Sequence, residues 1–277
     1  MILIADSGST KTDWRLCAES AEPRAFQTVG LNPFFVSPDA MKQLLTDTFA
    51  DSLEAVDALY FYGAGCVPAK IPMMETVFHD VFPHASVFVA SDLLGAARAL
   101  CGRQPGIACI LGTGSNSCYY DGNAMTDNVS PLGFILGDEG SGAVMGRLLV
   151  ADYLKHQMPE ALRADFAQRY DIVPAEVIER VYRQASPNRY LANFARFIAY
   201  HLDDPYVQNL VEAQFTAFFR RNVMQYPQHR DVPVSFVGSV AYYLKEHLVA
   251  AAQPLGITVG EVVQSPIDGL CRFHVAK

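Results

Sequence analysis

The chain of 277 residues has few charged side chains, a single tryptophan and no long uninterrupted apolar stretch. Only 18% of the residues are charged and 51% are hydrophobic, which excludes a disordered or low-complexity polypeptide. The 21 basic residues are outnumbered by 29 acidic ones, and the net charge of -8 disfavours nucleic acid and anionic membranes as partners. No run of about 18 apolar residues lacks a charge, proline or glycine, so we expect no membrane-spanning helix.

Metal-binding and disulfide patterns are absent as well. The six cysteines form no CxxC pair or zinc spacing, and the seven histidines form no HxxxH or HExxH motif. We therefore expect reduced, buried thiols and no structural zinc. No basic segment precedes the apolar residues 1–5, which predicts a first strand rather than a secretory signal, and hence a cytoplasmic protein.

Two strand–turn–strand units lie about a hundred residues apart in the sequence. Each has an apolar strand, a turn rich in Gly, Ser and Thr, and a second strand. Because each unit opens one half of the chain, we expect a duplicated, two-lobed α/β fold. The three parts cover residues 1–5, 6–12 and 13–17 in the first unit, and 107–111, 112–117 and 118–120 in the second.

Hydrophobic spacing predicts the remaining elements. The first half alternates between helices and strands, whereas a long stretch of the second half is helical and forms an insertion or layer. We expect an N-terminal lobe of residues 1–104, with 265–277 packing back on it, and a C-terminal lobe of residues 105–264. Helices are expected at 38–55, 71–82, 92–100, 143–155, 159–226, 241–252 and from 267, and strands at 58–62, 86–90, 232–237 and 257–259.

The glycine-containing turns do not match the common nucleotide-binding motifs. GxxxxGK[ST] is absent, and residues 112–114 lack the third glycine of a dinucleotide fingerprint, so neither a P-loop nor a Rossmann site is supported. Two Gly/Ser/Thr turns could instead direct backbone N–H groups and hydroxyls at an oligophosphate from opposite sides, with Asp6 holding a hydrated Mg2+. A single turn of this kind is usually an ordinary hairpin turn, and it is the pair that favours function.

Four segments together resemble a known family. DSGSTKT at 6–12, GTGSN at 112–116, GDEGSG at 137–142 and VGSV at 237–240 are similar to motifs of the N-acetylglucosamine kinases and the BadF/BadG/BcrA/BcrD ATPases. This family is part of the sugar kinase, Hsp70 and actin superfamily, and the resemblance spans nearly the whole chain. It implies a two-lobed actin-like, or ribonuclease H-like, ATPase fold with duplicated β-hairpin phosphate loops, a helical layer in the second lobe, and ATP and Mg2+ as cofactors.

The resemblance also implies which residues contact the nucleotide. The two hairpins would hold the ATP phosphates, one from each lobe, and the late glycine turn would lie against the adenosine. Asp6 would bind Mg2+. The implied cofactor-binding residues are Asp6, Gly8, Ser9, Thr10, Lys11, Gly112, Thr113, Gly114, Gly238 and Ser239.

On the sugar side, the resemblance implies that Asp92 is the catalytic base, at the start of its helix. The implied substrate-binding residues are Asn32, Gly65, Asp92, Gly114, Ser115 and Asp138. One segment departs from the family: residues 131–134 read Pro-Leu-Gly-Phe, where animal N-acetylglucosamine kinases carry Gly-Trp-Gly. The preference for an acetamido group is therefore left open by the sequence.

Simpler interpretations exist for the same residues. Asp92 could be a helix N-cap or first-turn acid, and Asp138 and Glu139 could complement a helix dipole. Asn32 precedes a proline, which commonly starts a turn. Arg220 and Arg221 are expected to be a solvated pair.

The function expected from these features is ATP-dependent phosphorylation of an amino sugar, N-acetylglucosamine first, to the 6-phosphate. The alternatives are an ATPase that activates a partner enzyme and a sugar-binding regulator with weak catalysis. The activator ATPases need cysteines that hold an iron-sulfur cluster, whereas the cysteines here lie in apolar strand runs. The expected partners are the amino sugar and ATP, with neither nucleic acid nor membrane, and a homodimer is left open.

Overall fold

Two units, each with its own five-stranded sheet, make up the chain. The computed structural model describes residues 1–8, 10–18 and 21–275. Unit 1 consists of Met1–Gln104, Asp121–Met125 and Ser265–Lys277, and unit 2 consists of Pro105–Tyr120 and Thr126–Gln264. The division of roles between two lobes stays a prediction.

The sheet of unit 1 has the strand order β3-β2-β1-β4-β5. Its first three strands form an antiparallel meander, while β4 and β5 run parallel to β1. Strand β3 was not expected from the sequence; it is an edge strand with little burial that pairs with β2 along its length. The bounds are β1 (Ile2–Ser7), β2 (Lys11–Cys17), β3 (Arg24–Val29), β4 (Ala58–Gly63) and β5 (Ser86–Ser91).

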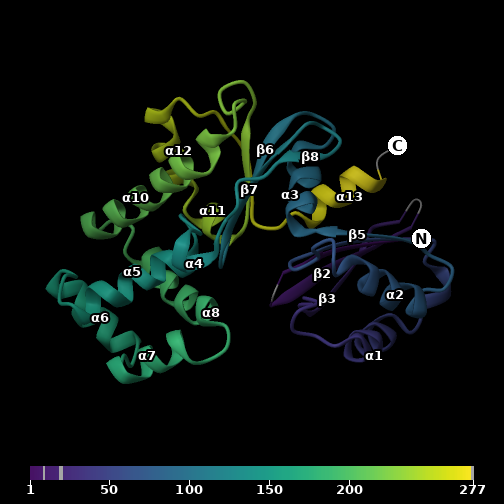
Figure 1. Ribbon diagram of the computed structural model, residues 1–277, viewed down its shortest axis with the longest axis horizontal. Coiled ribbons are helices and arrows are strands. Elements are labelled where there is room, and N and C mark those ends of the chain that lie inside the picture. Colours follow the sequence, from purple (N-terminus) through teal and green to yellow (C-terminus); the bar gives the residue numbers. More distant parts are fainter. Residues whose placement is uncertain (9, 19–20, 276–277) are drawn as a thin grey trace. The chain divides into compact units, whose positions relative to one another are not determined.

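Helices cover both faces of this sheet (Figure 1). Because side chains alternate along a strand, Leu3 and Ala5 of β1 enter one apolar core with α1 and α2, whereas Ile4 enters the other with α3 and α13. The helix expected at 38–55 is shorter and is followed by the single turn η1. The bounds are α1 (Pro38–Phe49), η1 (Leu53–Ala55), α2 (Ile71–Val81), α3 (Asp92–Cys101) and α13 (Ile267–Val275).

The sheet of unit 2 repeats this topology, with the order β8-β7-β6-β9-β10. β6 and β7 are antiparallel, and β9 and β10 run parallel to β6, which confirms the duplicated α/β fold. The strand expected at 257–259 is shifted: only its last residue, Val259, belongs to β10, which continues through Gly260 and Glu261, two residues of low strand propensity. The bounds are β6 (Gly106–Leu111), β7 (Ser115–Tyr120), β8 (Met125–Asp127), β9 (Val234–Val237) and β10 (Val259–Val263).

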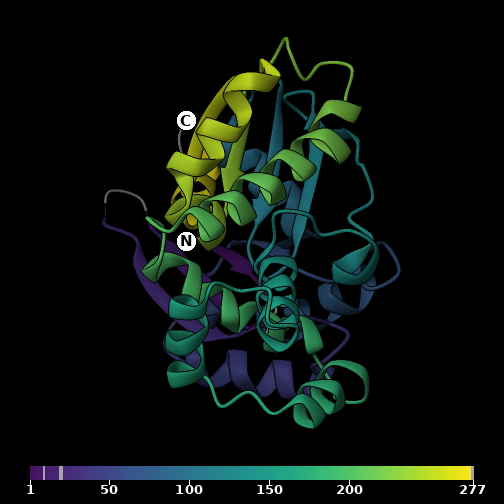
Figure 2. The ribbon, with the colours of Figure 1, turned by 90° about the vertical axis from the view of Figure 1, so that its left-hand side faces the viewer.

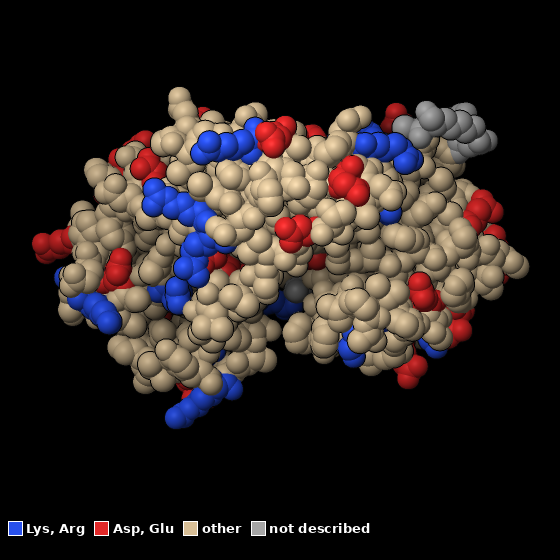
Figure 3. Space-filling model, turned by 45° about the horizontal axis from the view of Figure 1, so that its top comes forward, with Lys and Arg blue, Asp and Glu red and all other residues tan. Residues whose placement is uncertain are grey.

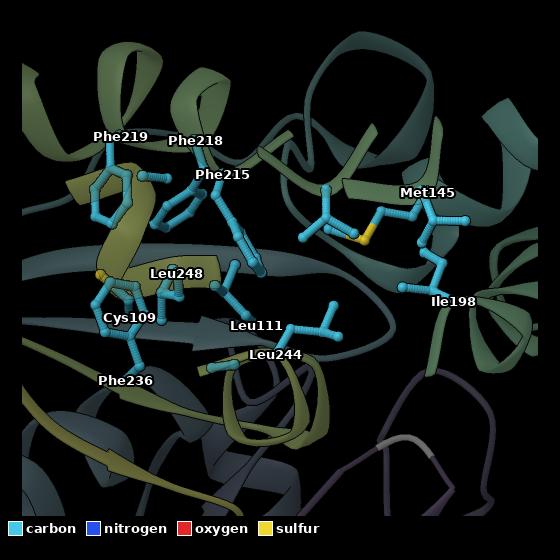
Figure 4. Packing of buried hydrophobic residues seen from close by; sticks show 14 of the residues in the cluster. Cys109, Leu111, Met145, Ile198, Phe215, Phe218, Phe219, Phe236, Leu244 and Leu248 are labelled. Atoms are coloured by element: carbon cyan, nitrogen blue, oxygen red, sulfur yellow. The ribbon is translucent and has the colours of Figure 1, made fainter. Parts of the chain in front are cut away.

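A helical layer accompanies this second sheet, as expected from the stretch 159–226. Figure 2 shows α10 crossing in front of the strands, and Figure 4 shows its side chains Phe215 and Phe218 directed at Leu111 of β6. Phe218 and Phe219 also pack against Phe236 of β9. The bounds are α4 (Gly133–Leu136), α5 (Gly142–Leu154), α6 (Glu160–Arg169), α7 (Pro174–Tyr182), α8 (Pro187–Ala192), η2 (Asn193–Ala195), α9 (Arg196–Tyr200), α10 (Pro205–Arg221), η3 (Val223–Gln225), α11 (Ser239–Tyr243), α12 (Lys245–Ala252) and η4 (Gln253–Leu255).

The surface and the cysteines agree with the composition. Most of the face in Figure 3 is formed by uncharged residues. Across the described ranges, no helix combines the length and the apolar character needed to cross a bilayer. Four of the six cysteines are buried: Cys17, Cys66, Cys109 and Cys118.

Candidate functional site

Two carboxyl groups, those of Asp6 and Asp92, lie at one edge of the first sheet. The parallel strands β1, β4 and β5 end at this edge, where Asp6 is in register with Tyr62 and Tyr62 with Ala90. Asp92 follows two residues after Ala90. Burial raises the pKa of Asp6 to about 7, and the negative charge of Asp92 contributes in the same direction. The edge therefore brings together two half-buried acidic groups.

The helix α3 does not use Asp92 as its cap. The Ser91 hydroxyl is the N-cap and accepts a hydrogen bond from the Leu94 N–H at 3.3 Å. Asp92 is the first helical residue, and its Oδ1 accepts the Leu93 N–H at 2.9 Å. Burial raises the pKa of Asp92, and its backbone hydrogen bonds oppose this. A carboxylate that is not needed for capping and has a raised pKa is suited to accept a proton.

Close packing fixes α3 on the sheet. A Cβ at Gly95 would lie 2.7 Å from the Tyr62 Cβ, so only glycine allows this approach of α3 to β4. The buried Cys66 thiol lies near the same edge, and its pKa is raised to about 12 by burial and by the charge of Asp92. Sequence reasoning did not identify Cys66, which has no motif signal.

The first hairpin turn is organised by Ser7, a residue that the site prediction left out. Its hydroxyl lies 2.8 Å from the Thr12 hydroxyl and accepts the Leu31 N–H at 3.0 Å. The Gly8 N–H is used within the turn, since it donates to the Lys11 carbonyl at 2.9 Å. These bonds tie the hairpin to the segment that carries Asn32.

Two polar side chains of this turn are exposed. Thr10 is one of them; the Lys11 side chain is 58% exposed, and its ammonium is 2.8 Å from the Asp13 carboxylate. Ser9, which was also expected to contact the nucleotide, lies outside the described residues.

Asn32 and Gly65, both expected to contact the sugar, touch each other. Gly65 has φ +82, and a Cβ there would lie 2.5 Å from the Asn32 Oδ1. Asn32 is buried, and its Oδ1 accepts the Phe34 N–H at 3.0 Å. The Asn-Pro turn expected as the simpler interpretation is therefore present, and it holds the amide against the glycine turn.

In unit 2, the structure brings Gly114, Ser115 and Asp138 together. The Asp138 Oδ1 accepts the Ser115 N–H at 3.3 Å, and a Cβ at Gly114 would lie 3.2 Å from the Asp138 Oδ2. Burial raises the pKa of Asp138 to about 6, the Ser115 bond lowers it, and the charge of Glu139 raises it. Asp138 also has φ +54, a left-handed conformation that is rare for a side-chain-bearing residue. Buried charge combined with backbone strain is typical of functional sites.

The second hairpin turn is fastened to the start of α5. The Gly112 carbonyl accepts the Gly142 N–H at 2.8 Å, and the Thr113 carbonyl accepts the Ala143 N–H at 3.0 Å. These bonds occupy the carbonyl groups of the turn. The Thr113 side chain is exposed.

Gly238 lies against the beginning of the same turn. Its φ is +121, and a Cβ there would lie 2.3 Å from the Leu111 carbonyl oxygen. Ser239 follows as the exposed first residue of α11. The late glycine turn and the second hairpin are therefore in contact within unit 2.

Glu139, left unassigned by the sequence, has two partners at the end of α10. Arg221 Nε donates to one carboxylate oxygen, and Asn222 Nδ2 donates to the other at 3.2 Å. The sequence predicted that Arg221 would be solvated. Its side chain is 62% exposed, but it also forms this ion pair.

Only Asp6 was expected to bind metal. Within the described ranges, no group of three or more His, Cys, Asp or Glu side chains could hold a metal ion. A single carboxylate fits Mg2+, which commonly binds one or two carboxylates and keeps its other positions for water and substrate phosphates.

Proteins similar to this chain are found among solved structures. No protein-family model and no curated protein matches the chain. A solved structure from Porphyromonas gingivalis is 50% identical over 99% of this chain and 98% of its own, with a TM-score of 0.94. One from Chromobacterium violaceum is 18% identical over 98% of each chain, with a TM-score of 0.65. Both are described as a "putative N-acetylglucosamine kinase".

A third similar structure is a ROK family glucokinase from Streptomyces griseus in complex with glucose and AMPPNP. It is 15% identical over 97% of each chain, with a TM-score of 0.59. At this identity, the second and third structures indicate a shared fold.

Proposed function

Because the chain belongs to the family of N-acetylglucosamine kinases and BadF/BadG/BcrA/BcrD ATPases and has their two-lobed actin-like fold, we propose that it is an ATP-dependent sugar kinase. The acceptor is an amino sugar, N-acetylglucosamine first, and the product is N-acetylglucosamine 6-phosphate. The half-identical relative from Porphyromonas gingivalis, matched over nearly the full length of both chains, supports this assignment.

The observation that carries the proposal is the placement of Asp92. It begins α3 at the edge where Asp6 also lies, Ser91 relieves it of capping, and burial raises its pKa. A raised pKa makes the carboxylate a stronger base. In the proposed reaction, the sugar hydroxyl oxygen forms a bond to the γ-phosphorus, its proton passes to the Asp92 carboxylate, and the bond to the ADP oxygen breaks.

The residues proposed to contact the nucleotide lie on the hairpin turns and on the late glycine turn. Thr10 and Thr113 offer hydroxyls to the phosphates, and the Gly238–Ser239 turn lies against the adenosine. Asp6 would hold Mg2+, which neutralises phosphate charge when bound. The AMPPNP bound to the related glucokinase supports ATP as the donor.

The residues proposed to contact the sugar are Asn32, Gly65, Ser115 and Asp138. The Asp138 carboxylate can accept hydrogen bonds from two hydroxyls, which gives orientation as well as affinity. Residues 131–134 depart from the Gly-Trp-Gly segment of animal N-acetylglucosamine kinases, so the panel below compares several sugars.

The test is ADP release from Mg-ATP in the presence of N-acetylglucosamine, glucosamine, N-acetylmannosamine, glucose or no sugar. Asp92→Asn is expected to lower kcat by roughly 100-fold or more, because the substitution removes the proton acceptor. Asp39→Asn is the matched control, because Asp39 is an exposed acid in the first turn of α1, a helix that also has a serine, Ser37, as its N-cap.

Sugar-dependent release that is lost in Asp92→Asn and kept in Asp39→Asn would support the kinase. Release that does not depend on sugar would favour the partner-activating ATPase. Sugar binding without any release would favour the regulator. An Asp92→Asn variant that keeps the full kcat would refute the role given to Asp92.

A further inference from the structure

Glu139, the residue after Asp138, is held by two side chains from the end of α10. The Glu139 side chain is 15% exposed, and each carboxylate oxygen has a donor from the end of α10, namely Arg221 Nε and Asn222 Nδ2. Asn222 is itself buried and is the C-cap of α10. Glu139 therefore joins the segment 137–142 to a long, well-packed helix.

A second contact at the neighbouring residue fastens the same segment. Gly140 has φ +74, and a Cβ there would lie 3.3 Å from the Phe218 Cβ and 3.5 Å from the Leu111 Cδ2. Before Glu139, the Asp138 N–H donates to the Pro131 carbonyl at 2.9 Å. The strained backbone of Asp138 thus lies between fixed points on either side.

We propose that Arg221 is a positioning residue, which acts through Glu139 to hold Asp138 in its left-handed conformation and to set the charge environment of its carboxylate. This inference rests on the proposed sugar kinase function, in which Asp138 contacts the sugar. Glu139 and Asp138 point to different partners, α10 and the second hairpin respectively. The ion pair therefore orients the segment without occupying the sugar-binding oxygens.

Glu139 is the charged neighbour in unit 2 that changes the pKa of Asp138. Apart from Glu139, Asp138 contacts Gly114, Ser115, Pro131 and Ser141, and none of these four has an ionisable side chain. Glu139 raises the pKa of Asp138 through its negative charge, and Arg221 balances that charge. Removing the arginine should therefore make Asp138 easier to protonate, and removing the glutamate charge should make it harder.

The experiment measures kcat and the KM values for sugar and ATP against pH in Arg221→Ala, Arg221→Lys and Glu139→Gln. Arg221→Ala is expected to raise the sugar KM roughly tenfold and the ATP KM much less. The acid limb of the sugar kcat/KM profile should move up by about half a pH unit in Arg221→Ala and down in Glu139→Gln. Arg221→Lys keeps the charge and should leave the limb in place.

Arg220→Ala is the matched control, because Arg220 is exposed and forms no ion pair in the part of the chain described here. It should leave both KM values and the pH profile unchanged. Limbs that move in the same direction in Arg221→Ala and Glu139→Gln would overturn the proposal, and so would an Arg221→Ala variant that behaves like Arg220→Ala. Simple loosening of the fold would not give shifts of opposite sign.

A readout without activity separates this inference from the proposed function. The pKa of Asp138 can be obtained from the pH dependence of the unfolding free energy, by comparing each variant with its Asp138→Asn double variant. If no sugar is turned over by the wild type, the proposed function fails. Opposite shifts in the unfolding experiment would still support the coupling of Arg221 to Asp138, and equal pKa values in all variants would refute it.

Discussion

Replacing Asp138 with Asn is expected to stabilise unit 2 at neutral pH. The Asp138 side chain belongs to a residue that is 8% exposed, and burial is the main reason that its pKa rises from 3.8 to about 6. The backbone there has φ +54, a conformation that Asn adopts more readily than most residues other than glycine. The Asn oxygen can still accept the Ser115 N–H. The substitution therefore removes a buried charge with little change of shape.

The size of the effect follows from the pKa. A rise from 3.8 to about 6 corresponds to about 3 kcal/mol of unfavourable free energy for the charged form in the folded state. The folded protein keeps this proton up to about pH 6, while the unfolded chain releases it near pH 4, so wild-type stability falls as the pH rises between these values. Asp138→Asn should thus exceed the wild type by about 3 kcal/mol above pH 6 and match it below about pH 4.

The assay is urea unfolding at pH 4 and pH 8, followed by far-ultraviolet circular dichroism. The only tryptophan, Trp14, is buried in unit 1, so its fluorescence reports that unit and serves as an internal reference. Asp121→Asn is a control of opposite sign in unit 1, followed by the Trp14 fluorescence of that unit, because the N–H groups of Ala124 and Asn123 lower the pKa of Asp121. The variant should lose stability at pH 8.

Two results would refute this reasoning. One is an Asp138→Asn variant that is no more stable than the wild type at pH 8. The other is a gain of the same size at pH 4 and pH 8, because a pH-independent gain cannot come from removing a titrating charge. In the kinase assay, the same variant should raise the KM for sugar, since an amide accepts fewer hydroxyl hydrogen bonds than a carboxylate.

Two further substitutions test the packing around the site. Gly238→Ala should lower the unfolding free energy by about 2–4 kcal/mol, because its φ of +121 and the Leu111 carbonyl leave no room for a Cβ. Gly112→Ala is the control in urea unfolding, because a Cβ there meets no atom within 4 Å. Equal losses of stability in the two variants would contradict the strain argument. Tyr62→Phe should cost about 1–3 kcal/mol, because the buried hydroxyl is 2.7 Å from both Arg98 and His274; an unchanged urea midpoint would show that water replaces it.

Much of the fold could be predicted from local patterns. The two Gly/Ser/Thr hairpins are visible because apolar strands flank a polar turn in each, and the strand order confirms that they open equivalent sheets. The misses have a common cause. Strand β3 is an exposed edge without alternating apolar residues, and β10 contains glycine and glutamate, so neither has the pattern of a half-buried strand.

The candidate site also contains residues that could be predicted from the sequence and residues that could not. Asp92 and Asp138 could be named from the sequence through the resemblance to the kinase family, whereas an acid next to a helix start by itself favours the simpler capping or dipole interpretation. Glu139 could not, because its partners Arg221 and Asn222 are 82 and 83 residues away in the chain. Ser7 could not be distinguished from the other turn residues, because its role depends on a hydrogen bond from the Leu31 N–H, which lies 24 residues further along the chain.

The sequence by itself determined most of the elements, the duplicated hairpins and the chemical groups available at their turns, because propensity and hydrophobic period act over a few residues. Only the tertiary structure decided which groups are buried and which lie together. Burial raises the pKa of Asp6 to about 7 and that of Asp138 to about 6, and the contact between Asn32 and Gly65 brings together two segments distant in the chain. Desolvation and contact depend on the whole fold around a group, and local sequence does not contain them.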